Sequence, residues 1–373
     1  MGKPNLDILN ISDIHLGHPN NKTSWIINHL DLYFIEHKDI IKNVDIIIIS
    51  GDTFDRLLPN NSRELVAINS WLARLAKFCI SYNIYLMFLE GTPSHDYKQL
   101  RNFDSVINTL DLKDLKYKYA EDLEIVYFKE FDRTIMFLPD EYRDNAVDTF
   151  IEVKNKLKEH NLDKVDIVVM HGAFKYQIPQ YDSDHFHIES DYLSIVNEVI
   201  IVGHVHFFSQ FEKILVPGSF DALTHSDDDL TKGGLYISLR GGKFTYKFLI
   251  NSKVTKFTTI DISDISLDIV DNKLRRYAVS KDPIFVRLLT KEEDDKIIFT
   301  FNSFREKYPN LILTQLAKKK KKEEVVKREV VKREFKSIDQ TAIEKYIVEE
   351  LKNDNRLTNE DKALVLEELN LLF

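Results

Sequence analysis

The sequence predicts an α/β protein in which two sheets pack together and are flanked by helices. A small α+β domain and a C-terminal helical tail are expected to follow. Short apolar runs alternate with longer amphipathic segments, which is typical of layered α/β folds. Runs such as Ile46–Ile49 are apolar on successive residues, which indicates strands that are covered on both faces. From Val199 onward, short strands follow one another closely and predict a second, largely antiparallel sheet.

The first part of the chain carries the elements of the layered fold. The expected strands are Leu6–Ile11, Val44–Ser50, Ile84–Leu89, Val165–Met170 and Val199–Val202. The expected helices are Ser24–Lys42, Ser62–Tyr82 and Asn145–His160. In the second of these helices, apolar residues recur at spacings of three and four, namely Leu65, Ile68, Leu72, Leu75 and Cys79.

The second sheet is expected to contain Phe211–Val216, Gly234–Leu239 and Lys243–Ile250, with Gly241-Gly242 as a hairpin turn. The first domain would then span residues 1–254. Residues 255–317 are predicted to form the small α+β domain. Its expected elements are strands at Thr255–Ile262, Ile284–Leu289 and Lys296–Phe301 and a helix at Ser266–Tyr277.

Residues 318–340 are strongly charged and repeat Val-Val-Lys-Arg-Glu at 325–329 and 330–334. A solvated helix or linker is the favoured interpretation of such a charge run. The alternative is a basic face that contacts phosphates, with Lys318, Lys319 and Lys320 as candidate DNA contacts. Residues 341–373 are predicted to form two amphipathic helices with more apolar surface than so short a segment can bury, which favours binding to a partner helix.

Composition limits the class of protein. The single cysteine, Cys79, excludes a disulfide framework and fits a reducing compartment. Residues 1–10 show no signal peptide, and no apolar run approaches the roughly 18 residues of a membrane span. We therefore expect a cytoplasmic protein, in the host cytoplasm if the source is a bacteriophage. The net charge of −9 speaks against a nucleic-acid partner only superficially, because bound cations would reverse the local field.

Five segments share one arrangement, in which an apolar strand stops beside a glycine and polar residues. They are Asp13-Ile-His15-Leu-Gly17, Gly51-Asp52, Gly91-Thr-Pro-Ser-His95-Asp96, His171-Gly172 and Gly203-His204-Val-His206. A single histidine in such a turn is more often structural than functional. Because five segments agree, and because ligands of open α/β sheets bind at the carboxyl ends of strands, we expect one functional site there.

Aspartate and histidine without thiols supply oxygen and nitrogen ligands, which suit Mn, Fe or Zn and exclude a Cys-rich zinc site. There are enough of these residues for two ions. Paired ions stabilise both the attacking and the departing oxygen of a phosphoryl displacement. The sequence contains no P-loop, no Gly-x-Gly-x-x-Gly fingerprint and no Gly-x-Ser-x-Gly elbow. Hydrolysis of a phosphate ester is therefore the predicted chemistry.

These motifs resemble those of the calcineurin-like metallophosphoesterase superfamily. Within it, Ser-Asp-Ile-His-Leu-Gly at 12–17, Gly-Asp-Thr-Phe-Asp at 51–55 and Pro217-Gly218-Ser219 are similar to the DNA-repair nuclease branch. That branch includes the bacterial SbcD nuclease and bacteriophage recombination exonuclease subunits. The resemblance implies a two-sheet metallophosphoesterase sandwich. It also implies that residues 255–317 are a capping domain that would bind DNA, and this domain and the helical tail fit the same branch in order and length.

The resemblance also implies a role for each motif residue. Asp13, His15 and His206 would bind one metal ion, Asp52 would bridge, and His171 and His204 would bind the other. His95 would be the catalytic histidine, which stabilises the transition state or protonates the leaving 3′ oxygen. Asp96 would orient the His95 imidazole. The ions would be two divalent cations, with Mn²⁺ preferred over Mg²⁺, Fe²⁺ or Zn²⁺.

One segment departs from the family pattern. The family has Gly-Asn-His followed by Asp or Glu, with the Asn as a ligand of the second metal ion, whereas this chain has two more residues and no Asn. The hydroxyl of Thr92 or Ser94, or a water molecule, is a candidate substitute. Alternatively, Pro93 reroutes the loop and returns His95 to its usual place.

Three functions remain open at this point. The first is a DNA nuclease, with 3′–5′ exonuclease and endonuclease activity, in DNA repair and recombination. The resemblance gives it an SMC-like ABC ATPase of the SbcC type as a partner, bound through residues 342–373, and a homodimer within a heterotetramer. The second is a stand-alone phosphoesterase that acts on small phosphodiesters or phosphoproteins. The third is an inactive scaffold for the ATPase, supported only by the altered loop.

Overall fold

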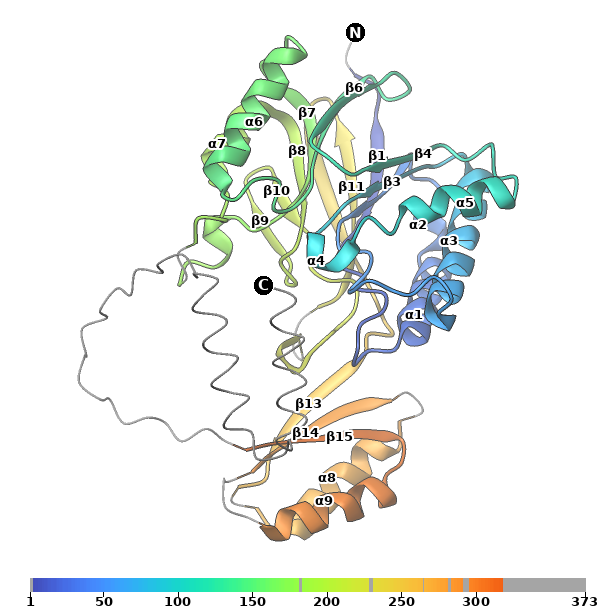
Figure 1. The fold of residues 1–373 in the computed structure, drawn as a ribbon, viewed down its shortest axis with the longest axis vertical. Helices are drawn as coiled ribbons and strands as arrows, with labels where there is room; N and C mark the ends of the chain where they lie inside the picture. Colours follow the sequence, from blue (N-terminus) through green and yellow to red (C-terminus); the bar gives the residue numbers. More distant parts are fainter. Residues whose placement is uncertain are drawn as a thin grey trace, which may run out of the picture. The chain divides into compact units, whose positions relative to one another are not determined.

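Two six-stranded sheets form the centre of the computed structural model (Figure 1). The structure describes residues 3–180, 183–227, 231–263, 265–280, 283–290 and 295–317. The strand order of the first sheet is β12-β11-β1-β2-β3-β4. These strands are β1 (Leu6–Ile11), β2 (Ile46–Ser50), β3 (Tyr85–Leu89), β4 (Tyr117–Ala120), β11 (Gly233–Arg240) and β12 (Lys243–Ile250). Strands β1 to β4 are parallel, and β11 pairs antiparallel with β1.

The second sheet has the order β5-β6-β7-β8-β10-β9. Its strands are β5 (Glu124–Phe128), β6 (Arg133–Leu138), β7 (Val165–His171), β8 (Val196–Gly203), β9 (Ser209–Phe211) and β10 (Ile214–Val216). Only the β5–β6 and β9–β10 pairs are antiparallel. The prediction of a largely antiparallel second sheet was therefore wrong, and β11 and β12 extend the first sheet instead. Both hairpin strands are amphipathic, and that pattern does not specify which sheet receives them.

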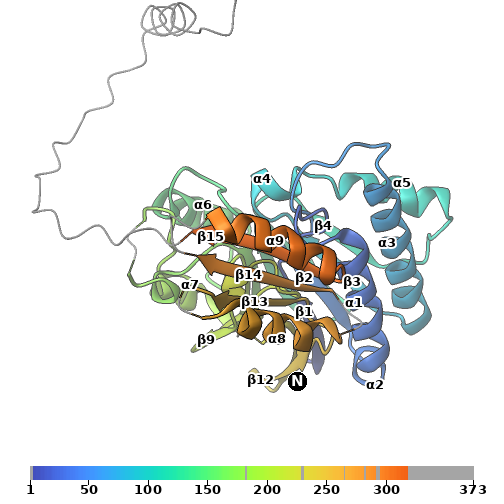
Figure 2. The same cartoon turned by 90° about the horizontal axis from the view of Figure 1, so that it is seen from below.

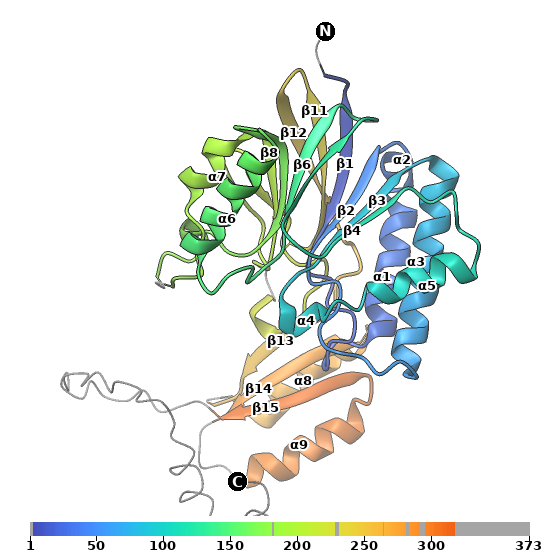
Figure 3. The same cartoon turned by 45° about the horizontal axis from the view of Figure 1, so that its top comes forward.

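Helices cover the outer face of each sheet, and Figure 3 shows the resulting layers. On the first sheet lie α1 (Thr23–Glu36), α2 (Lys38–Ile41), α3 (Arg63–Tyr82) and α5 (Arg101–Thr109). On the second sheet lie α6 (Ala146–Glu159) and α7 (Glu189–Ile195). A short helix, α4 (Pro93–Asp96), lies in the loop after β3. The predicted α/β class with two packed sheets flanked by helices is confirmed.

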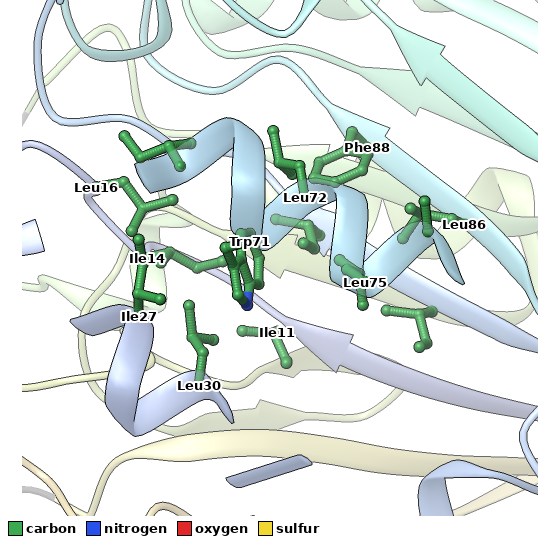
Figure 4. Close-up of a cluster of buried hydrophobic side chains, with 14 of the residues drawn as sticks. Ile11, Ile14, Leu16, Ile27, Leu30, Trp71, Leu72, Leu75, Leu86 and Phe88 are labelled. Carbon is green, nitrogen blue, oxygen red and sulfur yellow. The ribbon is translucent and has the colours of Figure 1, made fainter. Parts of the chain in front are cut away.

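Successive isoleucines of β2 pack in different hydrophobic clusters on opposite faces of the strand, as the uninterrupted apolar run predicts. Ile46 and Ile48 belong to the cluster that fills the space between the sheets. Ile47 and Ile49 pack instead in the cluster under α1 and α3. Figure 4 shows this second cluster, in which Trp71 of α3 lies among leucines and isoleucines from α1 and the sheet. Both faces of the strand are thus removed from water.

Local signals place the helix ends. The Ser62 hydroxyl accepts a hydrogen bond from the Leu65 amide, which caps the start of α3, and Asn83 ends the helix in the left-handed conformation. The Asn145 side chain caps α6 in the same way, through the Asp148 amide. The single helix expected at Ser24–Lys42 is divided at His37 into α1 and α2.

A third sheet contains the parallel strands β13 (Lys256–Asp261), β14 (Ile284–Thr290) and β15 (Leu311–Ala317). The helices α8 (Leu267–Ala278) and α9 (Asp295–Lys307) pack against it (Figure 2). The predicted strand at Lys296–Phe301 was wrong, since this segment lies within α9. Its β-branched and aromatic residues favour a strand locally, but Phe301, Phe304 and Tyr308 recur at helical spacing and face the core of the sheet.

The charged segment 318–340, the tail 341–373 and Lys318, Lys319 and Lys320 lie outside the described residues. The predicted domain limits and the two tail helices therefore remain predictions. Among the helices that the structure describes, none is both long enough and apolar enough to span a membrane.

A buried ion pair joins two strands of the second sheet, and we expect it to be essential for stability. The Arg133 side chain on β6 is fully buried, and its Nε donates to Glu198 Oε2 on β8 at 2.5 Å. Glu198→Ala would leave the guanidinium without its counter-charge and should lower the free energy of unfolding by about 3–5 kcal/mol. Urea denaturation would measure the change. The matched control is Asp31→Ala, which breaks the exposed pair with Arg74 and should cost about 1 kcal/mol or less. Equal losses in both variants would contradict the prediction.

Candidate metal centre

The predicted site residues meet where strands of both sheets end. Asp13 and His15 follow β1, Asp52 follows β2, and the Gly91–His95 loop follows β3. From the second sheet, β7 ends at His171, and β8 ends at Gly203, just before His204 and His206. Both oxygens of the Asp13 carboxylate lie 3.0–3.1 Å from the His204 amide, so loops of the two sheets are joined directly. The rule that ligands bind at the carboxyl ends of parallel strands thus predicts this meeting point.

The backbone is strained at several of these residues. Asp13, His15, Asp52 and His204 all have positive φ, at 50°, 53°, 47° and 99°. Such a conformation costs a non-glycine residue on the order of 1–3 kcal/mol. Backbone hydrogen bonds hold the first two loops in register, from Asp13 N to Gly51 O and from His15 N to Asp52 O. This backbone conformation costs free energy, but it directs the four side chains toward a common point.

The first group of ligand atoms comes from Asp13, His15 and His206, and these atoms lie within 4.8 Å of one another. Nε2 of His15 is 3.2 Å from Nε2 of His206. These two nitrogens can form a hydrogen bond with each other only if one of them carries a proton. Burial lowers the pKa of His206 to about 4 despite the nearby Asp13 carboxylate, so this imidazole is neutral at pH 7. Two imidazoles that face one another next to a carboxylate suit a divalent cation.

His15 is also supported from behind. Its Nδ1 is 3.1 Å from Oδ1 of Asp55, which leaves Nε2 directed at the group. A carboxylate on the far ring nitrogen fixes the tautomer and raises the basicity of a metal-binding histidine. The contact therefore makes Asp55 a residue that supports His15.

Asp52 lies at the centre of the site. Its Oδ2 is 2.8 Å from His95 Nδ1, 3.4 Å from His171 Nε2 and 3.7 Å from His15 Nε2. Burial opposes a charge on this carboxylate, but the surrounding histidines lower the pKa of Asp52 well below its ordinary value. One carboxylate therefore lies between histidines of both sheets, as a bridging ligand must.

His171 provides the test of whether a metal ion fits. Its Nδ1 lies 2.7 Å from the Ser50 carbonyl oxygen and donates to it, so Nε2 points into the site. That Nε2 is fully buried and has no hydrogen-bond partner. Burial alone would lower the pKa of His171, yet Asp52, Asp13 and Asp140 raise it well above the ordinary value. The same field that attracts a proton attracts a divalent cation, so the residues fit a metal ion.

Asp140 is a site residue that the sequence interpretation missed. Its Oδ2 lies 3.2 Å from Nδ1 of His204, and Asp140, His171 and His204 form a further group of potential ligands. Asp140 follows β6, which ends at Leu138, so it occupies the same position relative to its strand as the five predicted segments. The apolar run Ile135–Leu138 followed by Pro139-Asp140 is the sequence signal for this strand end.

The Gly91–His95 loop brings His95 to the site from the side. The His95 side chain is 36% exposed, and its Nδ1 contacts Asp52. The resemblance implied that Asp96 orients the His95 imidazole, but the two side chains are not hydrogen-bonded. The buried Asp96 carboxylate instead accepts hydrogen bonds from the amides of Phe54 and Gly91, each at 2.7 Å. Asp96 thus holds the loop in shape, and Asp52 takes the position next to His95. Burial, together with Asp52 and Glu90, raises the pKa of Asp96 well above its ordinary value.

The two candidate substitutes for the missing Asn lie in different surroundings. Thr92 is buried, and its amide donates to Asp52 Oδ1 at 2.7 Å. Ser94, by contrast, is exposed.

Gly203 shows how tightly the sheets approach at the site. A Cβ atom on this residue would lie 2.1 Å from Ser50 O, 2.2 Å from Ser12 Oγ and 2.6 Å from His171 Nδ1. Gly203→Ala is therefore expected to push the two sheets apart, to lower the free energy of unfolding by about 1–3 kcal/mol or more, and to weaken metal binding. Thermal unfolding and Mn²⁺ titration would measure both effects. Gly241→Ala, where a Cβ meets no atom within 4 Å, is the control for steric clash, although its positive φ adds a small cost. Wild-type Mn²⁺ binding in Gly203→Ala would contradict this description.

Comparisons with known proteins leave the family undecided. No family model and no curated protein matches the chain. Among solved structures, that of TT1561 from Thermus thermophilus is similar with a TM-score of 0.37 at 13% identity, and the match covers 67% of this chain and 100% of that one. A second crystal structure gives a TM-score of 0.38 at 13% identity and covers 66% and 100%. Both scores are low, and neither similarity indicates an activity for this chain.

Proposed function

We propose that this protein is a two-metal-dependent phosphodiesterase that cleaves DNA. The observation that carries the proposal is the position of Asp52, whose one carboxylate lies between His15 of the first ligand group and His171 on the second sheet. A shared carboxylate is what a paired metal site requires. The motif resemblance to the calcineurin-like metallophosphoesterases, and within them to the SbcD-like nucleases, supports the same proposal from the sequence.

Each side chain then has a defined task. Asp13, His15, Asp52 and His206 would hold one divalent ion, and Asp52, His171 and His204 would hold the other. Two such cations, when bound, would neutralise charge on the phosphate and activate water for attack. The oxygen and imidazole donors suit Mn²⁺, Fe²⁺ or Zn²⁺, and the sequence resemblance favours Mn²⁺, with Mg²⁺ as a further alternative.

His95 would act on the substrate itself. A hydrogen bond to Asp52 raises the pKa of His95, while burial partly opposes that shift. The imidazole therefore holds a proton more readily near neutral pH than an ordinary histidine does. Its side chain is partly exposed at the edge of the site, which supports a role in giving that proton to a leaving 3′ oxygen.

The substrate and the partners rest on the sequence resemblance. It supports DNA as the substrate, with 3′–5′ exonuclease and endonuclease activity in repair or recombination. It also supports a homodimer that joins an SMC-like ABC ATPase through residues 342–373, in the cytoplasm. An acidic net charge is compatible with DNA binding where bound cations and local basic segments dominate the field.

The test is cleavage of a 3′-labelled duplex and a labelled single strand in the presence of Mn²⁺, Mg²⁺ or EDTA. We expect cleavage with Mn²⁺ and none with EDTA. An Asp13→Ala variant, purified in the same way, controls for contaminating nucleases and should not cleave. If the wild type leaves both DNAs intact with every metal, while it hydrolyses a small diester such as bis(p-nitrophenyl) phosphate, the stand-alone phosphoesterase is correct instead. Inactivity on both substrates, with metal bound, would favour the scaffold.

A further inference from the structure

We propose that Asp140 is a ligand of the second metal ion and that it takes the place of a ligand from the Gly91–His95 loop. The inference rests on the proposed two-metal site, and it adds a residue that lies outside all five motif segments. Asp140 comes from the second sheet, two residues beyond the end of β6. Because β6 is parallel to β7, which ends at His171, the two residues leave the sheet at the same edge.

The carboxylate of Asp140 faces the second group of ligands. Its Oδ2 is 3.2 Å from His204 Nδ1, and a ligand atom from each of Asp140, His171 and His204 can be chosen within 4.8 Å of the others. The Asp140 side chain is only 11% exposed. A carboxylate so far removed from water needs a compensating positive charge, and a divalent cation among these three residues would supply it.

An independent observation comes from His171. Its Nε2 is fully buried without a hydrogen-bond partner, and its orientation is fixed from behind by the Ser50 carbonyl. Buried polar atoms in native proteins are almost always satisfied, so this nitrogen points to a ligand that it binds. Together with Asp52 and His204, the two residues give the second site two carboxylates and two imidazoles.

The hydroxyl of Thr92 is committed elsewhere. Its Oγ1 lies 3.1 Å from Asp140 Oδ2 and 3.3 Å from Asp52 Oδ2, so its single proton is used in hydrogen bonding to a carboxylate. Thr92 precedes Pro93 and has the extended backbone that this position favours, which directs it at both aspartates. We therefore assign Thr92 as a positioning residue that sets the spacing of the two carboxylates.

This arrangement gives the altered loop a physical explanation. A neutral amide or hydroxyl is a weaker ligand for a hard divalent cation than a carboxylate is. With Asp140 supplied by the second sheet, the loop after β3 is not required to carry a ligand. It can then hold Thr92 and His95 alone, and the second site joins both sheets through Asp52 and Asp140.

The experiment measures Mn²⁺ binding to the full chain without DNA, by equilibrium dialysis and by electron paramagnetic resonance. Two ions about 3.5–4 Å apart are spin-coupled, which reports the pair directly. We expect two coupled ions in the wild type and a single uncoupled ion in Asp140→Ala. Glu141→Gln, which removes the neighbouring exposed charge, is the matched control and should keep the pair. Thr92→Val should also keep the pair, with the affinity for the second ion weakened by about 10–100-fold.

Two results would overturn the assignment. One is a coupled pair of wild-type affinity in Asp140→Ala. The other is loss of the second ion in Thr92→Val but not in Asp140→Ala, which would make the hydroxyl the ligand. If Asp140→Ala fails to fold by circular dichroism, Asp140→Leu, which fills a similar volume without a donor atom, replaces it, and undiminished affinity for the second ion in that variant would equally refute the proposal.

The binding experiment also separates this proposal from the proposed function. A wild type that binds two coupled ions, loses one in Asp140→Ala and still does not cleave DNA retains the ligand assignment and rejects the nuclease. A wild type that binds fewer than two ions rejects the paired site and the Asp140 assignment together.

Discussion

Asp52→Ala is expected to abolish cleavage and to remove the metal pair together. The Asp52 carboxylate contacts histidines of both sheets, with His171 at 3.4 Å and His15 at 3.7 Å. Without it, the two proposed metal sites would lose their shared ligand. Each ion, when bound, would contribute several kcal/mol to stabilising the transition state, so activity should fall by on the order of 10³-fold or more. Dialysis against Mn²⁺ and a single-turnover cleavage assay would measure the two losses.

Folding must be separated from function in this variant. The surrounding histidines hold the pKa of Asp52 well below its ordinary value, so the carboxylate stabilises the metal-free fold at neutral pH, and Asp52→Ala is expected to be less stable than the metal-free wild type. Circular dichroism would check that the variant is folded. Asp39→Ala, at an exposed carboxylate on α2, is the control and should retain both ions. A folded Asp52→Ala protein that still binds two coupled ions would show that Asp52 does not bridge them.

His95→Ala is expected to abolish cleavage while leaving both metal ions bound. The imidazole lies at the exposed edge of the site and reaches Asp52 through Nδ1. Among the described residues, it belongs to no group of potential ligands that includes a residue from the second sheet. Loss of a general acid lowers the rate by about 10²–10⁴-fold. His160→Ala, which removes an exposed histidine at the end of α6, is the matched control.

The choice of leaving group tests the role of His95 more sharply. A p-nitrophenolate leaves without a proton, so a p-nitrophenyl diester should lose much less rate in His95→Ala than DNA does. An equal loss on both substrates, with two ions bound, would assign His95 to charge stabilisation and not to proton transfer. Normal cleavage of DNA by His95→Ala would exclude both roles.

The layers of the fold could be predicted because the burial of an element's faces determines the pattern of apolar residues along its own sequence. The isoleucines of β2 are apolar on successive residues, and the leucines of α3 recur at helical spacing, so each element shows which of its faces are covered. The position of the site was predictable for a similar reason. A polar residue beside a glycine at the end of an apolar strand identifies the sheet edge where ligands bind.

Knowing the residue types and the ends of the strands was not enough to predict which side chains contact one another across the site. Asp96 is adjacent to His95 in sequence, yet it turns inward to the Phe54 and Gly91 amides, and Asp52 contacts the imidazole. Asp140 follows a strand that the sequence interpretation passed over, and only the parallel pairing of β6 with β7 brings it beside His204.

Sheet membership was decided in the same way. The hairpin of β11 and β12 carries an amphipathic pattern that either sheet can accommodate, and the antiparallel register with β1 selects the first. In α9, local propensity for a strand gives way to a helical face that buries Phe304 and Tyr308 against the third sheet. Tertiary packing overrides such short-range preferences because burial of aromatic side chains outweighs propensities of less than about 1 kcal/mol per residue.

The sequence by itself thus determined the α/β class, the strand ends that form the site and the aspartates and histidines that stand there. These features depend on periodicity and residue type, which are local. The tertiary structure alone decided which carboxylate oxygen faces which histidine nitrogen or backbone amide. It placed Asp52 between histidines of both sheets, directed Asp96 to backbone amides and brought Asp140 of the second sheet next to His204. Those contacts join residues far apart in the chain, and they depend on strand order and register, which no local pattern specifies.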